Sequence, residues 1–344
     1  MNRNKTIRNT THALLLLSGL GLLFSCEDRL LSADPEPAPE AVFEQLWSDV
    51  RDRYSYLELK NVNWDSVGEV YREEIDHTTS DTALFRMLAM MLNTLKDGHV
   101  NLTSEFNRSR NWDWFLDYPE NYDQALVDRH YLREDHVITG PLLNRVIDSV
   151  LYVNYRSFGN TITEDHLAAL MDRAAGMKGV IIDVRNNGGG NLNNGYKLAS
   201  CFTDSTRIFA YQRYKTGPGP EAFTSWGEMT IEPRKEARFK GPVVLLTNRR
   251  SYSASTFFAQ MMQTIPHATL IGDATGGGGG IPAYGELPNG WTYRFSATQT
   301  ITPTGDHIEI AVPVDLRVDI DPDDEANGVD TIIETALALL LNRM

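Results

Sequence analysis

The stretch VIIDVRNNGGG, residues 180–190, decides the fold of this 344-residue chain. It opens on an uninterrupted apolar run rich in β-branched residues, which is typical of a strand buried on both faces of a sheet. The three glycines that end it permit positive φ angles and a close approach of the backbone to a neighbour. The pattern therefore predicts a buried strand followed by either a plain strand-to-helix connection or backbone amides aimed at an anion.

A second buried strand is predicted downstream, over residues 243–248 (VVLLTN). It leads through two arginines into the small, polar residues 251–256 (SYSAST) and then into the apolar residues 257–262 (FFAQMM). This order predicts a strand, a tight elbow and a helix. A serine at such an elbow is exposed at the edge of the sheet beside the free amides of the helix start. The alternative is that these serines are only helix caps.

A histidine far upstream supplies a candidate base. His99 lies in LKDGHVNL, residues 95–102, after a helix-spaced apolar pattern that includes Leu84, Leu88 and Met91. A serine hydroxyl is a poor nucleophile until a base takes its proton, and a neutral imidazole is suited to that task. The alternative is a hydrogen-bonded structural histidine at the end of a helix.

Three ordered blocks, DGHV at 97–100, DVRNNGGG at 183–190 and SYSAS at 251–255, resemble the C-terminal processing and tricorn-type serine peptidase family. Residues 150–158 and 302–315 resemble the family's opening strand and closing segment. The resemblance spans most of the chain. It implies an α/β fold with a spiral β-β-α core like that of crotonase and ClpP. The amphipathic spacing over residues 41–95 predicts a helical N-terminal subdomain. Many relatives have a PDZ module at about residues 103–143, but this segment is too short for a complete one, so no complete PDZ domain is expected.

The resemblance also assigns roles to residues of the elbow and of the glycine turn. Ser253 falls where the family has its nucleophile. The backbone amide of Ala254, with that of Gly189 or Gly190, would form the oxyanion hole. Such donors matter because the tetrahedral intermediate carries a full negative charge on the former carbonyl oxygen.

The choice of base separates two branches of this family. No lysine follows Lys240, and the position of the lysine base in the processing proteases falls at or near Gly278, so a serine–lysine dyad is not expected. The tricorn-like branch, which is related to interphotoreceptor retinoid-binding protein, uses a histidine, and His99 matches its position. Glu309 matches the glutamate of that branch's relay, whereas Gly98 replaces the relay serine. Glu309 would orient His99 directly or through water.

Two other functions remain open on the sequence. One is a catalytically silent member that binds a peptide or an apolar ligand, as the family's retinoid-binding members do. The other is a crotonase-like enzyme acting on an acyl thioester. The expected activity needs no cofactor, and the remaining histidines lack the spacing of a metal site. The glycine run 276–280 lacks the Gly-Lys-Ser/Thr ending of a phosphate-binding loop and is expected to be a mobile loop.

Composition limits the partners and the domain organisation. The formal charge of −14 argues against nucleic acid as a partner. The partner that the family resemblance implies is a peptide or protein substrate. We expect a helical subdomain over residues 41–102, a connecting segment over 103–147 and the peptidase core over 148–344. Asp183 and Arg185 are expected to form a structural ion pair that holds the turn. The oligomeric state is not encoded in any pattern that we recognise.

The N-terminus predicts export. Three basic residues precede an apolar run over residues 13–24, which is too short for a transmembrane helix but typical of a secretory signal. LFSC at 23–26 resembles the lipobox of bacterial lipoproteins, so residues 1–25 would be removed and Cys26 lipidated. Ordinary signal cleavage is the alternative.

A proline-bearing tether over residues 26–40 would follow the anchor. The chain has only one other cysteine, Cys201, so a disulfide does not explain Cys26. Glu27 and Asp28 resemble an outer-membrane or surface-export signal. The expected location is therefore the bacterial cell envelope, with a lipid anchor in the outer membrane.

Overall fold

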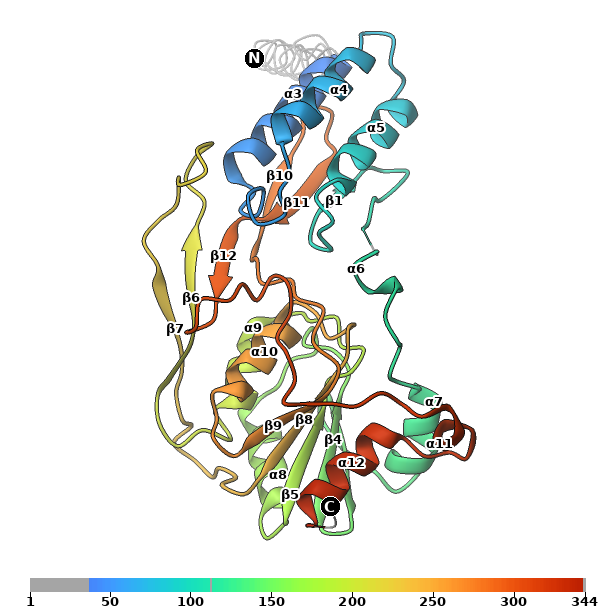
Figure 1. Ribbon diagram of the computed structural model, residues 1–344, viewed down its shortest axis with the longest axis vertical. Coiled ribbons are helices and arrows are strands. Elements are labelled where there is room, and N and C mark those ends of the chain that lie inside the picture. The colour runs from blue at the N-terminus through green and yellow to red at the C-terminus, as the bar shows by residue number, and fades with distance from the viewer. Residues whose placement is uncertain (1–36, 112, 343–344) are drawn as a thin grey trace, which may run out of the picture.

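A computed structural model describes residues 37–111 and 113–342 of the chain. The predicted signal peptide and the lipidation site Cys26 lie outside these residues. A large sheet flanked by helices forms one end of the molecule, and a smaller helical part forms the other end (Figure 1). No helix in the described ranges is long and apolar enough to cross a membrane.

The core is a seven-stranded sheet in the order β13-β9-β8-β5-β4-β3-β2. The strands from β13 to β4 pair in parallel, and β3 and β2 are antiparallel additions at one edge. Every residue of the central strands β4, β5 and β8 is buried, as their continuous apolar sequences predict. The strands are β2 (Val137–Thr139), β3 (Leu142–Ile147), β4 (Val150–Tyr155), β5 (Gly179–Asp183), β8 (Val243–Thr247), β9 (Ala268–Gly272) and β13 (Leu316–Arg317).

Helices cover both faces of this sheet. Alternate side chains of β4, β5 and β8 pack on one face against α8 (Glu164–Ala174), α9 (Leu192–Ala199) and α10 (Ala254–Gln263). The other alternate set packs against η1 (Val127–Leu132) and α12 (Thr331–Leu340). The short helices α7 (Gln124–Leu126) and α11 (Pro322–Ala326) lie at that side (Figure 1). This layered arrangement confirms the predicted α/β class.

The N-terminal helices pack on a small sheet to which the C-terminal part of the chain contributes. Helices α3 (Pro39–Arg53), α4 (Trp64–Glu74) and α5 (Asp81–Asn93) share one apolar core with the sheet β1-β11-β10. Only β1 (Asn101–Thr103) belongs to the predicted N-terminal range, because β10 (Pro282–Glu286) and β11 (Thr292–Ser296) form a later hairpin. The predicted boundaries stay a prediction, but this hairpin ties the two ends of the chain together.

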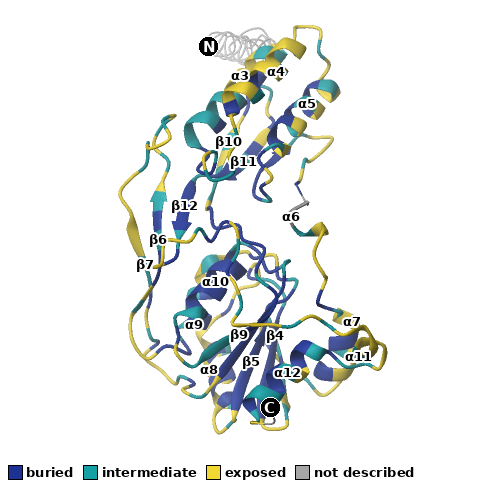
Figure 2. Ribbon diagram, viewed as in Figure 1, coloured by how far each residue is buried: buried dark blue, intermediate teal, exposed yellow. Residues whose placement is uncertain are grey.

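Two further segments run between the helical part and the core. On one side lies the antiparallel sheet β12-β6-β7, made of β12 (Thr298–Ile301), β6 (Arg207–Tyr214) and β7 (Gly227–Ile231). On the other side the chain passes through the short helix α6 (Asp113–Leu116) (Figure 1). Figure 2 shows the core strands buried along their length, while the loop beyond β6 and β7 and the outer sides of the N-terminal helices are exposed.

Candidate active site

The elbow after β8 holds one serine in an unusual backbone conformation. Ser253 stands immediately before α10 with φ 57° and ψ −118°, a region that side chains other than glycine rarely occupy. Its neighbours are engaged in structural bonds, since Ser251 Oγ donates to Val184 O at 2.8 Å and Ser255 Oγ donates to Asn187 O at 2.7 Å. The Ser253 backbone N–H donates to Gly277 O at 2.9 Å. The elbow is therefore fixed, and the Ser253 hydroxyl is left for another partner.

That partner is His99, from the turn after α5. His99 Nε2 lies 3.0 Å from Ser253 Oγ, a hydrogen-bond distance between residues 154 positions apart. The imidazole is buried, and its ring centroid lies 4.9 Å from that of Tyr252. Its other nitrogen, Nδ1, has no hydrogen-bond partner among the described residues. The structure thus brings together the two side chains that the sequence analysis singled out.

Asp97 anchors the turn that carries His99. Its Oδ1 accepts the backbone N–H of His99 at 2.7 Å. Three hydroxyls from separate elements also donate to its carboxylate: Tyr54 at 3.0 Å, Ser296 at 2.9 Å and Tyr252 at 3.4 Å. Burial by itself would raise the pKa of Asp97, but the nearby Lys60 and these hydrogen bonds outweigh burial and leave the pKa lowered. Asp97 is therefore a buried carboxylate that stays ionised.

Lys60 joins Asp97 to Glu309. Its ammonium lies 2.8 Å from Glu309 Oε1 and 3.9 Å from Asp97 Oδ2, in a setting where only 14% of the lysine side chain is exposed. The structure therefore brings the predicted Glu309 into the site. No direct hydrogen bond connects Glu309 to His99, and Glu309 Oε2 has no partner within the described part of the chain.

Burial displaces the pKa values of His99 and Glu309 in opposite directions. Burial lowers the pKa of His99 to about 4, Asp97 opposes this effect, and the positive charges of Arg294 and Lys60 add to it. Burial raises the pKa of Glu309 to about 7 against the attraction of Lys60. His99 is therefore neutral near pH 7, so its imidazole is in the form that accepts a proton.

The predicted anion-binding amides flank the elbow. Gly189 has φ +95°, and a Cβ there would lie 2.6 Å from Tyr252 O and 2.9 Å from Ala254 N. Its own N–H donates to Asn187 Oδ1 at 3.0 Å. Gly190 has φ +139° and forms a bridge with Phe158 on its other side. The N–H of Ala254 is the first of α10, so it has no acceptor inside the helix.

The glycine run 276–280 differs from the expected mobile loop. All five glycines are buried, and a Cβ at Gly277 would lie 2.0 Å from Glu309 O. At Gly278, where the processing proteases would have lysine, φ is +77° and a Cβ would lie 2.5 Å from the Tyr252 ring. The run is a packed wall of the site because only glycine fits these close contacts.

The ion pair predicted at the turn is structural. Arg185 is fully buried and pairs with Asp183 at 2.7 Å and with Asp330 at 2.9 Å. Asp330 also caps α12 by accepting from the backbone N–H groups of Ile332 and Ile333. Arg185 therefore ties the turn after β5 to the C-terminal helix. No group of three His, Cys, Asp or Glu residues that could hold a metal ion occurs among residues 37–111 and 113–342.

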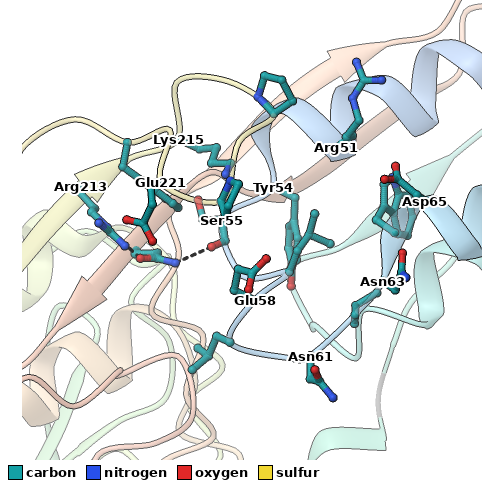
Figure 3. Close-up of a pocket in the computed structure, with 18 of the residues that line it drawn as sticks. Arg51, Tyr54, Ser55, Glu58, Asn61, Asn63, Asp65, Arg213, Lys215 and Glu221 are labelled. Carbon is teal, nitrogen blue, oxygen red and sulfur yellow. Dashed lines mark hydrogen bonds between the residues drawn. The ribbon is translucent and has the colours of Figure 1, made fainter.

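Two cavities lie near this cluster. One of about 470 Å³ reaches Lys60, Asp97 and Glu309. A second of about 880 Å³ lies between the α3–α4 connection and the segment after β6. Figure 3 shows that charges of both signs line the second cavity, including Arg213, Lys215, Glu58 and Glu221. Neither lining includes Ser253 or His99, so these cavities lie beside the serine–histidine pair rather than around it.

Sequence reasoning missed Lys60 and Asp97 as parts of the site. Lys60 is a single cation in the segment YSYLELK, residues 54–60, which is otherwise rich in tyrosine and leucine. A single lysine in such an apolar segment predicts a buried charge with an acidic partner, but it does not indicate which residue that partner is. Asp97 lies in the quoted DGHV block, and only the fold reveals that three hydroxyls converge on it.

Comparison with known proteins places these residues in a family. The model of peptidase family S41 matches residues 149–323, just over half of the chain. The model of the tricorn protease C1 domain matches residues 35–93. The first match contains Ser253, Gly189 and Gly190, whereas the second covers α3 to α5. The segment with His99 lies between the two matches.

The individual proteins that are similar to this chain are also proteases or peptidases by name. The carboxyl-terminal-processing protease of Synechocystis is 31% identical over 157 residues, or 45% of this chain and 34% of that protein. The carboxy-terminal processing protease CtpA of Bacillus subtilis is 25% identical over 45% of this chain and 32% of that protein. The chain thus spans about a third of these curated relatives. The crystal structure of a provisionally assigned peptidase from Parabacteroides merdae is 38% identical and superposes with a TM-score of 0.84, covering 89% of this chain and 97% of that one.

Proposed function

The chain belongs to peptidase family S41, and on this basis we propose that it is a serine peptidase that cleaves peptide bonds through an acyl-enzyme on Ser253. The observation that carries the proposal is the 3.0 Å distance between His99 Nε2 and Ser253 Oγ. This geometry allows direct proton transfer, and it favours catalysis over a silent ligand-binding role.

The reaction proceeds in two halves. His99 Nε2 takes the proton of Ser253 Oγ as the oxygen attacks the peptide carbonyl, which creates a tetrahedral intermediate and an imidazolium. The imidazolium then gives its proton to the leaving amine, and the carbonyl re-forms as an ester on Ser253. In the second half His99 takes a proton from water, the hydroxide attacks the ester, and the acid product leaves with Ser253 reprotonated.

Backbone amides stabilise the oxyanion in both halves. We assign Ala254 N–H and Gly190 N–H to this role ahead of Gly189, because the Gly189 N–H already donates to Asn187 Oδ1 at 3.0 Å. The positive end of α10 lies at the same point. Loss of one such donor typically costs about a hundredfold or more in rate.

Of the buried charges behind His99, Asp97 stabilises the imidazolium, whereas Lys60 opposes it. Asp97 is ionised and contacts the His99 backbone, and Lys60 lies between Asp97 and Glu309. We propose that Glu309 acts on His99 at a distance by holding Lys60, which limits how strongly the lysine charge opposes protonation of His99. Glu309 is then a positioning residue rather than one that touches the reacting atoms.

Cleavage of a peptide mixture tests the proposal. The wild-type protein is incubated with a defined peptide library, and products are identified by mass spectrometry. Ser253→Ala and His99→Ala should each lower cleavage by at least about a thousandfold. His77→Ala, at an exposed histidine of the N-terminal part, is the matched control and should cleave as the wild type does. Cleavage that survives in the Ser253 variant would overturn the assignment.

We also propose that the protein works outside the cytoplasm, anchored by a lipid on Cys26. The support is the apolar signal pattern over residues 13–24 and the LFSC block at 23–26. Metabolic labelling with a fatty acid should modify the wild type and not Cys26→Ala, and fractionation should place the labelled form in the outer membrane. A soluble, unlabelled wild-type protein would refute the anchor.

A further inference from the structure

Two arginines meet on one amide oxygen close to the serine–histidine pair. Arg108 Nη2 donates to Asn101 Oδ1 at 2.9 Å, and Arg294 Nε donates to the same oxygen at 3.0 Å. Asn101 is buried and stands two residues after His99. Neither guanidinium has a carboxylate partner among the side chains that the structure describes. Two cations are thus held side by side by a neutral group.

Arg294 lies on the face of the small sheet that leads to the site, and Arg108, from the segment after β1, forms a bridge with Thr103 of that strand. Asn101, Arg294 and Tyr284 are register partners across β1, β11 and β10. Their neighbours Leu102, Tyr293 and Phe295 point the other way, into the core shared with the N-terminal helices. Ser296 follows on the arginine face and donates to Asp97 of the site. The arginine row therefore lies one step along the sheet, about 7 Å, from a residue that contacts the site.

The electrostatic setting favours an anion at this position. Partial burial and the charges of Arg294 and Arg110 lower the pKa of Arg108, so like charges are crowded there. Arg294 also acts at His99, whose pKa it helps to lower. Glu286, the acidic residue in the next row of this face, forms no ion pair with either arginine. In a chain of net charge −14, such a cluster is a local attractor for a negative group.

We propose that Arg108 and Arg294 form a subsite for a carboxylate of the substrate, within about three residues of the bond that Ser253 cleaves. The inference rests on the proposed peptidase function. Guanidinium groups bind carboxylates through paired N–H donors, and both arginines keep donors beyond the one given to Asn101. The ring of Tyr284, which is 70% exposed, flanks the row. The carboxylate is either the free C-terminus of the substrate or an Asp or Glu side chain.

Cleavage of matched peptides tests the subsite and separates the two sources. One arm compares Asp and Glu with Asn and Gln at each position around the cleaved bond. The second arm compares free C-terminal acids with C-terminal amides. In one of the two arms, the wild type should cleave the peptide that carries the carboxylate with a kcat/KM about tenfold or more above that of the neutral peptide, as expected for charge-assisted hydrogen bonds. A preference in the first arm identifies a side chain, and one in the second arm identifies a terminus.

Arginine variants provide the decisive comparison. Within each variant the readout is the ratio of carboxylate to neutral peptide cleavage. This ratio should fall towards one in Arg108→Gln and Arg294→Gln. Arg86→Gln, which removes an exposed charge from α5, should keep the wild-type ratio. Arg108 is exposed, so Arg108→Glu can be made without disturbing the core, and it should favour lysine at the same peptide position. An unchanged ratio in these variants would overturn the subsite.

Binding to Ser253→Ala distinguishes failure of the subsite from failure of the peptidase. Peptides with and without the carboxylate are titrated against this variant by calorimetry. Cleavage by the wild type without carboxylate preference would overturn the subsite and leave the peptidase standing. Arginine-dependent binding of the carboxylate without any cleavage by the wild type would support the subsite and overturn the peptidase. Equal binding of both peptides together with no cleavage would overturn both.

Discussion

Replacing Glu309 by glutamine should change how the stability of the protein depends on pH. Glu309 is 6% exposed, and burial raises its pKa from the ordinary 4.5 to about 7 despite the Lys60 ammonium at 2.8 Å. Between these two values the folded protein holds a proton that the unfolded chain has released. Stability from this group is therefore fully present below pH 4.5 and is lost as pH rises through 7.

The size of the change in stability follows from the shift in the pKa of Glu309. A displacement from 4.5 to about 7 corresponds to about 3 kcal/mol of free energy of unfolding, lost between those pH values. Glutamine keeps the shape of the protonated acid and an oxygen for Lys60, but it does not titrate. Relative to the wild type, Glu309→Gln should therefore gain about 3 kcal/mol between pH 4.5 and pH 8.

Urea denaturation at a series of pH values measures this difference directly. His99 titrates in the opposite sense, since its lowered pKa makes stability rise between pH 4 and 6.5, so the wild type alone should show a nearly flat profile between 4.5 and 6.5. The variant should reveal the rise that Glu309 masks. If the two proteins keep a constant difference in free energy of unfolding from pH 4.5 to 8, Glu309 is not a buried, proton-holding group and the account of the site is wrong.

Three further outcomes follow from the same geometry. Because the pKa of His99 is lowered to about 4 and a base works only above its pKa, kcat/KM should hold as pH falls to 5 and drop only towards 4; a midpoint near 6.5 would contradict the buried setting. Ser253→Gly should be more stable to urea than Ser253→Ala by about 1 kcal/mol, because φ is 57°, and equal stabilities would refute backbone strain at the elbow. Gly278→Lys should lose about 2 kcal/mol or more in the same assay, because a Cβ there meets the Tyr252 ring at 2.5 Å, and should not restore cleavage to His99→Ala; regained activity would show that a lysine reaches the serine.

The parts of the site that sequence reasoning found are those with a local signature. Continuous apolar runs marked β5 and β8, and the small-residue elbow marked the start of α10, because strand burial and helix capping act over a few residues. The ordered sequence blocks indicate the family, and the match to the model of peptidase family S41 confirms that the chain belongs to it. His99 is identified because the block DGHV at 97–100 resembles the family, and not because of any helix or strand periodicity.

The parts that were missed depend on contacts between distant segments. The pairing of β1 with β11 joins residues almost 200 positions apart and cannot be deduced from either strand alone. Lys60 and Glu309, which form an ion pair at 2.8 Å, are far apart in the sequence, and the α3–α4 connection that carries Lys60 is tied to β11 by the hydrogen bond from Ser55 N–H to Ser296 O. Its composition predicts that the glycine run 276–280 is a mobile loop, whereas in the fold Gly277 packs closely against Glu309 and Gly278 against the Tyr252 ring. Amino-acid composition indicates which backbone conformations a segment can adopt, whereas its contacts with distant residues select the conformation in the folded protein.

The central claim is that His99 activates Ser253, and labelling with a serine-directed fluorophosphonate tests it most directly. The account predicts that the purified wild-type protein is labelled, that peptide mass spectrometry locates the label on Ser253, and that both Ser253→Ala and His99→Ala abolish it. A well-folded wild-type protein that takes up no label, or a label that persists in His99→Ala at the wild-type rate, would contradict the claim.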